Sequence, residues 1–419
     1  MLLNFRKIEN NQIIFVCNLL IALFFVTVLT FKKGYSYVPM ALGIIATLSW
    51  LFYRFKRKIH WQMDKEEKYF IFSLIAYFLT FVMSAVFNGD GFREIDNPSR
   101  ILLLIPLIFF FKLYPIKKVI LFHFIPIGAL LVGLLAVYHK FVLKLTKPFP
   151  GIMSIQAGDI AIILSLFSIT IAFFWFAQKQ NKIGILYIIF SGLGLLASVL
   201  TGARGGWIAF PFCFLLILLF NFKQINKKIL TLSTLLLIAA VSLFIYKPEF
   251  GIQKRYNVAK NDINLYFAKG HKHSSLGARF DMWENAFIAI SEKPVLGYGS
   301  SGYETFKKEQ VKSKKMAKTT LKFNSLHNQY LEAFVKRGVI GFAGLMAVLL
   351  VPLIIFARRL KTEDTAVKCL AVLGIVHITS HMVFFLSQSF LAHNSGSIFY
   401  FFVLILLYHL IKQKENTHQ

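Results

Sequence analysis

The chain has 419 residues, of which 57% are hydrophobic, and it contains 46 phenylalanines. A soluble globular domain does not need so large an apolar fraction, and long uncharged runs recur from one end of the chain to the other. Runs of about 18 or more such residues cross a bilayer as helices, and these runs lack the alternation of barrel strands. The composition therefore predicts an all-α, polytopic membrane protein. The net charge of +28 lies largely beside the apolar runs, which argues against a nucleic-acid surface.

Twelve apolar segments are predicted to span the membrane. They cover residues 12–31, 35–53, 69–87, 100–114, 119–138, 157–177, 183–200, 206–221, 229–246, 338–357, 366–387 and 394–411. The fourth is the weakest, because it is short and Pro115 closes it. The three cysteines, Cys17, Cys213 and Cys369, fall in different spans, so we interpret them as small apolar packing residues and expect no disulfide framework or metal cluster.

Charge predicts the orientation of the spans. With both termini cytoplasmic, every inside segment is basic, as the positive-inside rule requires. These residues are Arg6, Lys7, the run RFKRK at 54–58, Lys117, Lys118, Lys179, Lys182, Lys223, Lys227, Lys228, Arg358, Arg359, Lys361, Lys412 and Lys414. The outside loop at 139–156 is the exception, with three lysines.

One long polar segment, residues 247–337, separates the spans of residues 1–246 from those of residues 338–419, which also include a short cytoplasmic tail. Long loops cross the membrane regardless of charge, so its lysines do not overturn the orientation. The spacing of Leu276, Phe280, Trp283, Phe287 and Ile290 predicts an amphipathic helix that Ser274 or Ser275 caps and Pro294 ends. We therefore expect a partly helical, extracytoplasmic cap.

Three short motifs carry residues suited to chemistry on an anionic substrate. The first is TGARGGW at 201–207, in which glycines allow close backbone approach to Arg204. The second is SLGARFDMWENAF at 275–287, with Arg279 on the cap helix. A guanidinium offers planar, bidentate donors to phosphate. The alternatives are an interfacial arginine at position 204 and a solvated charge at position 279 that pairs with Asp281 or Glu284.

The third motif is NSLHNQYLEAF at 324–334, which places His327 directly before a span. Histidine takes up a proton near neutral pH, and Asn328 or Glu332 can orient its ring. The alternative is a structural histidine at the membrane interface. Among other polar groups, Asp159, His377 and His381 are predicted to lie within spans and to form helix–helix hydrogen bonds, although Asp159 and His381 lie towards the outer face.

The glycine-rich stretch LGYGSSG at 296–302 is a weaker candidate for an anion site, because it can present several backbone amides to one ligand. The chain contains no Walker loop, no HExxH zinc site and no GxSxG elbow. The predicted chemistry therefore depends on arginine electrostatics and one base.

Taken together, these motifs resemble the O-antigen ligase family, within the group that includes O-antigen polymerases and protein O-oligosaccharyltransferases. The RGGW turn, the arginine–tryptophan helix followed by PVLGYG, and HNQYLEAFVKRGVIG occur in family order around one large loop. The segment KRYNVAKNDINLY at 254–266 also resembles the loop entrance of enterobacterial ligases. The likeness is sharpest from about residue 200 to 345.

The resemblance implies an inner-membrane glycosyltransferase of lipopolysaccharide biosynthesis in a Gram-negative bacterium, with its active site facing the periplasm. Such enzymes transfer glycan from undecaprenyl pyrophosphate to a sugar hydroxyl of lipid A–core by inverting displacement, without a cofactor or metal. It implies catalytic roles for His327, Arg279 and Arg204. The substrate-binding residues that it implies are Asn328, Arg255, Tyr256 and Trp283.

Two alternatives remain open from the sequence. A polymerase with the same fold would join lipid-linked repeat units, and the motifs do not cleanly separate it from a ligase. A flippase of lipid-linked sugar would carry charged groups along a path through the spans, whereas the candidates here gather on one side.

Overall fold

The computed structural model describes residues 2–59, 61–203, 205–222, 226–246 and 252–416. Over these residues the chain is helical and contains no strand, which confirms the predicted all-α class. The first ten α-helices are α1 (Leu2–Thr27), α2 (Gly34–Leu51), α3 (Lys65–Phe87), α4 (Arg93–Leu104), α5 (Leu107–Leu113), α6 (Lys118–Val137), α7 (Ser154–Ala177), α8 (Asn181–Thr201), α9 (Ala209–Asn221) and α10 (Lys227–Tyr246). The remaining six are α11 (Ile252–Lys269), α12 (Ser275–Glu292), α13 (Gly299–Lys312), α14 (Gln329–Ala357), α15 (Thr365–Phe384) and α16 (Asn394–Asn416).

Eight helices in the described part of the chain are long and apolar enough to cross a membrane. They contain α2, α3, α6, α7, α8, α14, α15 and α16. The other four predicted spans correspond to α1, α4 with α5, α9 and α10. The fourth differs from its predicted bounds, because its helix begins at Arg93 and breaks at Ile105–Pro106, where proline cannot continue the backbone hydrogen bonding.

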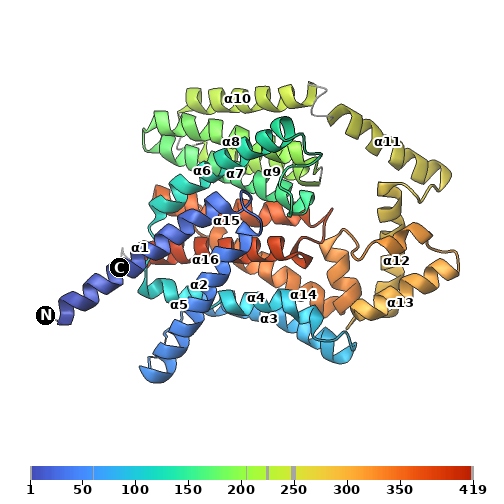
Figure 1. Cartoon of the computed structure of the whole chain (residues 1–419), viewed down its shortest axis with the longest axis horizontal. Coiled ribbons are helices and arrows are strands. Elements are labelled where there is room, and N and C mark those ends of the chain that lie inside the picture. The colour runs from blue at the N-terminus through green and yellow to red at the C-terminus, as the bar shows by residue number, and fades with distance from the viewer. Residues whose placement is uncertain (1, 60, 204, 223–225, 247–251, 417–419) are drawn as a thin grey trace.

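The centre of the bundle is formed by α7, α15 and α16, which Figure 1 shows surrounded by the other long helices. These helices bury residues on all sides, as expected for helices that are apolar all round. Helices at the rim instead expose large apolar side chains, among them Phe15, Phe72 and Phe87. A lipid bilayer would cover such a surface.

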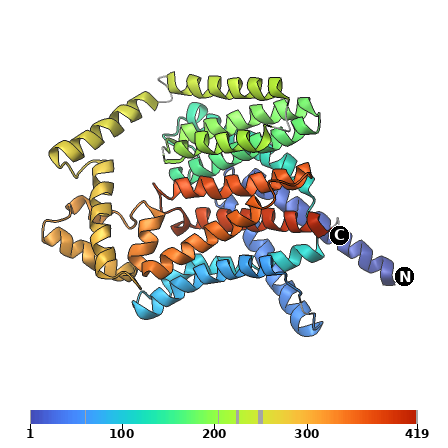
Figure 2. The same cartoon turned by 180° about the vertical axis from the view of Figure 1, so that it is seen from behind.

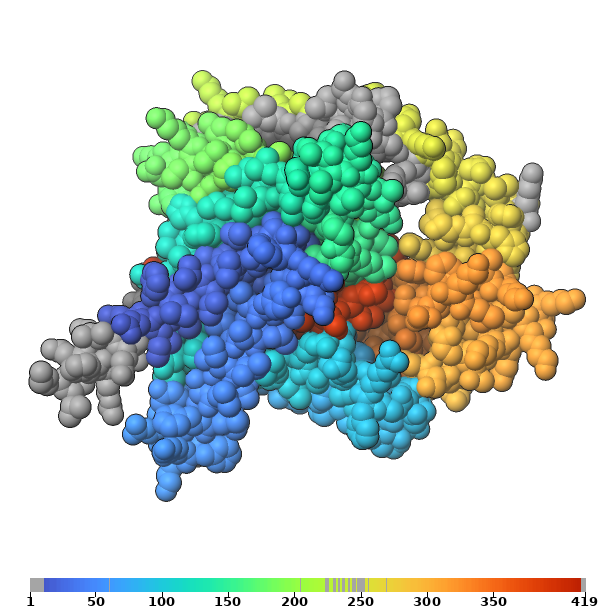
Figure 3. Space-filling model, viewed as in Figure 1, coloured from blue at the N-terminus to red at the C-terminus, as the bar shows by residue number. Residues whose placement is uncertain are grey.

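The polar segment forms α11, α12 and α13, which gather at the end of the bundle away from the two chain termini (Figures 1 and 2). Figure 3 shows its yellow and orange residues covering that end. The predicted amphipathic helix is α12, whose first turn is capped by Ser274 through a 3.0 Å hydrogen bond from the Gly277 amide. Its buried face follows Ala278, Met282 and Ala286, whereas Phe287, predicted to be buried, is exposed. The buried face packs in one core with Tyr303 of α13, with Leu326 and with Val335 of α14, and these contacts lie on the side away from Phe287.

The tenth predicted span, 338–357, begins earlier, because α14 starts at Gln329 and is kinked at Gly338. Gly338 has φ 60° and ψ −161°, which is accessible essentially only to glycine. The kink frees one carbonyl and one amide, and both are bonded by the loop after α12. The Tyr298 amide donates to the Val335 carbonyl at 2.8 Å, and the Val339 amide donates to the Pro294 carbonyl at 2.8 Å. These bonds fix the cap to α14.

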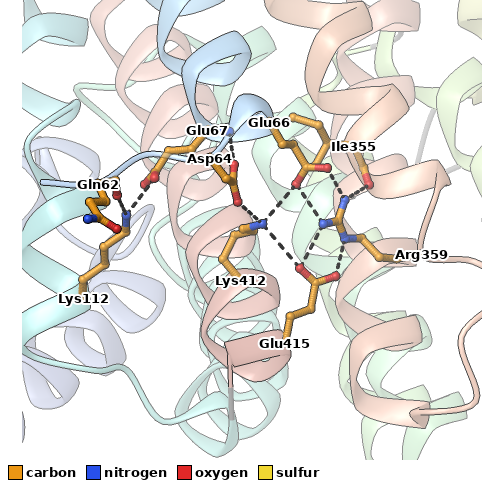
Figure 4. Close-up of polar contacts among 9 residues, drawn as sticks. All are labelled: Gln62, Asp64, Glu66, Glu67, Lys112, Ile355, Arg359, Lys412 and Glu415. Carbon is orange, nitrogen blue, oxygen red and sulfur yellow. Dashed lines mark hydrogen bonds and ion pairs between the residues drawn. The ribbon is translucent and has the colours of Figure 1, made fainter. Parts of the chain in front are cut away.

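An ion-pair network joins several segments at the opposite end of the bundle (Figure 4). Arg359, after α14, binds Glu66 of α3 and Glu415 of α16, each at 2.8 Å. Lys412 of α16 pairs with Asp64 at 2.7 Å, and Lys112 of α5 pairs with Glu67 at 2.7 Å. The segments predicted to be cytoplasmic around residues 54–68, 358–361 and 412–414 therefore share one end.

Candidate functional site

The three motifs meet at one short segment, Ser387–Ser389, which follows α15 and precedes the 3₁₀ turn η6 (Phe390–Ala392). Arg279 of α12 donates through Nη1 to the Ser387 carbonyl at 3.3 Å. His327 bonds Gln388 through Nδ1 at 3.0 Å. Gly205 of the first motif packs so closely on Ser387 that an added Cβ would lie 2.1 Å from its hydroxyl oxygen. Residues from α12, the start of α14 and the turn after α8 are thus held together.

The contact with Gln388 fixes the tautomer of His327. The Oε1 atom of Gln388 can only accept a hydrogen bond, so Nδ1 of His327 carries the proton. In the neutral ring Nε2 then holds the lone pair, and it makes no hydrogen bond with a described residue. The Nε2 amide of Gln388 donates to His393 Nε2 at 3.0 Å, and its other neighbour is the Met153 sulfur at 3.7 Å. Gln388 is fully buried, and the Met153 sulfur, which can accept but not donate, favours the orientation with the amide nitrogen on its side.

The backbone of His327 has φ 50°, in the left-handed region that residues with a side chain seldom adopt. Hydrogen bonds on both sides hold it there. Before it, the Leu326 carbonyl accepts from the Trp283 indole N–H at 2.8 Å, and the Leu326 amide donates to Glu332 at 3.1 Å. After it, the Asn328 side chain caps α14. This backbone conformation directs the imidazole towards Gln388.

The electrostatic environment keeps His327 neutral. Burial lowers the pKa of its imidazole, and the positive charge of Arg279 lowers it further. The hydrogen bond with Gln388 and the carboxylate of Glu332 act in the opposite direction, and the net pKa lies below the usual value. A neutral imidazole with a free Nε2 lone pair is the form that a general base requires.

Arg279 is half-buried on α12 and directed towards the Ser387–Ser389 segment. The two carboxylates considered as its partners from the sequence contact other residues. Asp281 is buried and pairs with Lys272 at 2.6 Å, and Glu284 accepts from the Tyr266 hydroxyl at 3.1 Å. Arg279 therefore places a positive charge beside His327.

Arg204 itself lies outside the described residues, but the turn that carries it is described on both sides. Gly202 ends α8 with φ 73°, and residues Gly205–Ile208 form the 3₁₀ turn η3. Gly206 faces Asp159 of α7, where an added Cβ would lie 2.3 Å from the carboxylate. The glycines thus allow the turn to pack against both α7 and the segment after α15.

Four residues were predicted to bind substrate: Asn328, Trp283, Tyr256 and Arg255. Their surroundings in the structure differ from one residue to the next. The Asn328 side-chain oxygen accepts from the Tyr330 and Leu331 amides at 3.0 and 3.1 Å, so it is occupied by the helix cap. The Trp283 N–H is occupied by Leu326, which gives Trp283 a positioning role beside His327. Tyr256 is 65% exposed on α11, about 15 Å along that helix from Tyr266, where α11 packs on α12. The Arg255 side chain lies outside what the structure describes, and substrate binding by all four residues stays a prediction.

The glycine-rich stretch at 296–302 does bind an anion, which is a carboxylate side chain of the same protein. The Asp90 carboxylate accepts from the Ser301 amide at 2.9 Å at the start of α13. Its other oxygen accepts from the Ser84 hydroxyl at 3.0 Å. This stretch therefore attaches the cap to the loop after α3, and no substrate role is needed to explain it.

The polar groups within the spans are largely structural. His377 bonds the Tyr400 carbonyl of α16 through Nε2 at 2.9 Å, as predicted for a helix–helix hydrogen bond. His381 instead bonds within α15, through Nδ1 to the His377 carbonyl at 2.7 Å. Asp159 is buried beside Gly206, and its Oδ1 has no hydrogen-bond partner among the described residues.

Sequence reasoning missed Ser387, Gln388 and Ser389. The Ser389 hydroxyl donates to the Glu332 carboxylate, which also accepts from the Leu326 amide next to His327. One signal was available, since three consecutive polar residues interrupt the apolar run FFLSQSFLA at 384–392. Their partners are distant in sequence, so the run does not reveal what they bind.

The region that carries the three motifs is similar to known proteins. A family profile described as O-antigen ligase matches residues 189–346, which include all three motifs. An uncharacterized protein of Haemophilus influenzae strain Rd is 48% identical over 398 residues, or 95% of this chain and 99% of that protein. The O-antigen ligase of Escherichia coli K12 is 28% identical over 163 residues, or 38% of this chain and 36% of that protein. The chain therefore carries an O-antigen ligase family domain over residues 189–346.

Proposed function

We propose that the protein is an O-antigen ligase, which transfers glycan from undecaprenyl pyrophosphate to a sugar hydroxyl of lipid A–core. The reaction would take place at the periplasmic face of the Gram-negative inner membrane. The observation that carries this proposal is the pairing of a neutral His327, with its Nε2 lone pair free, and the cationic Arg279 on one buried segment. A base and a pyrophosphate-stabilising cation are the two groups that such a transfer requires.

In the proposed reaction the acceptor hydroxyl oxygen attacks the anomeric carbon of the donor, and its proton passes to Nε2 of His327. The bond between the anomeric carbon and the pyrophosphate oxygen breaks, and undecaprenyl pyrophosphate leaves with the electron pair. Arg279 and Arg204 neutralise the charge that develops on this leaving group. Because a single displacement occurs, the anomeric configuration inverts. His327 then returns its proton to water.

The second candidate is an O-antigen polymerase, which would use the same chemistry with a lipid-linked repeat unit as acceptor. The family likeness supports the ligase and polymerase group as a whole, and the E. coli relative named O-antigen ligase favours the ligase within it. A flippase is disfavoured by the placement of the candidate residues, because His327 and Arg279 gather at the cap end and do not follow a path through the bundle.

Deletion of the gene with analysis of cellular glycans separates these functions. Loss of a ligase should leave bare lipid A–core and accumulated undecaprenyl-linked long polymer. Loss of a polymerase should instead leave core capped with a single repeat unit. A deletion strain with a wild-type glycan profile would contradict both proposals.

A further inference from the structure

A polar cavity lies beside the first turns of α14, between that helix, α3, α4 and the 3₁₀ turn η6. Its volume is about 180 Å³, or space for about six water molecules. Three cationic side chains line it, Arg93, Lys336 and Arg337, together with the two carboxylates Glu94 and Glu332. Lys336 and Glu332 neutralise each other in a 2.8 Å ion pair. The remaining lining charge is therefore positive.

Arg337 is the feature that the fold alone does not explain. It is only 6% exposed, yet its Nε atom has no hydrogen-bond partner among the described residues, and its guanidinium forms no ion pair with one of them. The Phe81 ring lies 3.8 Å from the guanidinium carbon, and the carboxylates of Glu332, Glu94 and Asp90 act on the charge from beyond ion-pair distance. A buried charge without a hydrogen-bonded counter-ion is costly, and a cation–π contact together with more distant carboxylates offsets only part of that cost. An anion in the cavity would supply the missing partner.

The cavity is linked to the candidate active site through Glu332. One oxygen of this carboxylate pairs with Lys336 at the cavity. The other accepts from Ser389 and from the amide of Leu326, the residue before His327. A ligand that extends from the cavity past Glu332 would therefore approach the segment that holds His327.

We propose that this cavity binds an anionic substituent, a phosphate or a carboxylate, on a sugar of the acceptor glycan. Arg337 and Arg93 bind the anion, while Glu94 limits the net charge and accepts from sugar hydroxyls. The anion is assigned to the acceptor because Arg279 already serves the donor pyrophosphate. That assignment rests on the proposed function, whereas the anion site itself does not.

The test uses full-length protein in lipid nanodiscs and three probes: glucose 6-phosphate, inorganic phosphate and glucose. Binding is followed by ³¹P line broadening, with glucose as a competitor. Glucose 6-phosphate should bind more tightly than the other two probes. Arg93→Gln, which alters an exposed residue at the cavity rim, should weaken this binding at least about tenfold, the loss expected for one charge-assisted hydrogen bond. Glu94→Gln should strengthen it.

Two controls locate the probe. Arg57→Gln removes an exposed arginine elsewhere and should leave binding unchanged. Arg279→Gln should also leave it unchanged, and loss of binding in this variant would place the probe beside His327 and overturn the proposal. Equal affinity for inorganic phosphate and glucose 6-phosphate would indicate a free-phosphate site and overturn the sugar assignment. Absence of binding by every probe would contradict the proposed anion site and leave Arg337 with a packing role alone.

Transfer assays separate this inference from the proposed function. Arg93→Gln should raise KM for an acceptor glycan that carries phosphate and leave KM unchanged for the same acceptor after phosphatase treatment. Equal KM values for the variant and the wild type with both acceptors would contradict the inference alone. Wild-type protein that binds glucose 6-phosphate but transfers no glycan would contradict the proposed function alone.

Discussion

The Nδ1 atom of His327 lies 3.0 Å from Oε1 of Gln388, a residue 61 positions later in the chain. This contact decides which ring nitrogen holds the lone pair, because an amide oxygen cannot donate a hydrogen bond. It also connects the start of α14 to the segment after α15. Gln388 is therefore a positioning residue for the proposed base.

Gln388→Leu should keep the size of the side chain but release the His327 ring. We expect the transfer rate to fall roughly 10- to 100-fold, a part of the 10²–10⁴-fold that a general base contributes. Gln388→Glu should retain more activity, because a carboxylate still accepts from Nδ1–H. It should also move the acid limb of the rate profile to higher pH, since a nearby negative charge favours the imidazolium. Wild-type rates in Gln388→Leu across the pH range would contradict this role.

The lowered pKa of His327 predicts how transfer depends on pH. A base is inactive when protonated, so the rate falls as pH drops through the pKa of the folded enzyme. Because burial and Arg279 place that pKa below the usual value of 6.5, the acid limb of kcat/KM should lie below pH 6.5. NMR of protein carrying labelled histidine should find a higher His327 pKa in Arg279→Gln. An unchanged or lower pKa in that variant would remove Arg279 from the surroundings of His327.

Arg279→Ala should lose transfer while the protein still folds, since α12 keeps its cap and its buried alanine face. Arg279→Lys should retain the charge but lose the bidentate fork, with a decrease of about 10- to 100-fold. Arg358→Ala, at an exposed arginine after α14, is the matched control and should act like wild type. Initial rates with purified protein measure all three, and near-normal rates in both Arg279 variants would leave the arginine without a catalytic role.

The proposed orientation predicts which cysteine substitutions are reached from outside. The native cysteines Cys17, Cys213 and Cys369 are buried, so background labelling should be low. Lys314→Cys, exposed in the cap segment, should react with a membrane-impermeant thiol reagent in spheroplasts. Lys179→Cys, exposed between α7 and α8, should react only after the membrane is permeabilised. The reverse pattern would place the candidate site in the cytoplasm.

Much of the fold follows from hydropathy, but several boundaries depend on tertiary contacts. The apolar runs predict the long helices because the length and composition of a segment can be determined from that segment alone. The kink at Gly338 was not predicted, because it depends on the loop at Pro294, more than 40 residues earlier, bonding the freed backbone groups. The exposed position of Phe287 likewise reflects the packing of α12 against α13 and α14, which periodicity does not encode.

Only part of the candidate site was predicted from the sequence, because the rest of it also depends on contacts between distant segments. Arg279 and His327 stand out because charged and titratable groups beside a membrane need an explanation, and the structure brings them to one segment. Gln388 does not stand out, because a single glutamine at a helix end has no signature of its own. Its importance comes from its partners His327 and His393, which only the folded chain supplies.

The most direct test of the central claim is glycan transfer by purified protein and its His327→Ala variant. Both are supplied with undecaprenyl-pyrophosphate-linked glycan and lipid A–core, and products are identified by mass spectrometry. We predict transfer by the wild type and a loss on the order of 10²–10⁴-fold in the variant. The variant should still bind the donor, because the arginines that hold the pyrophosphate remain. Transfer by His327→Ala at close to the wild-type rate would show that the base lies elsewhere.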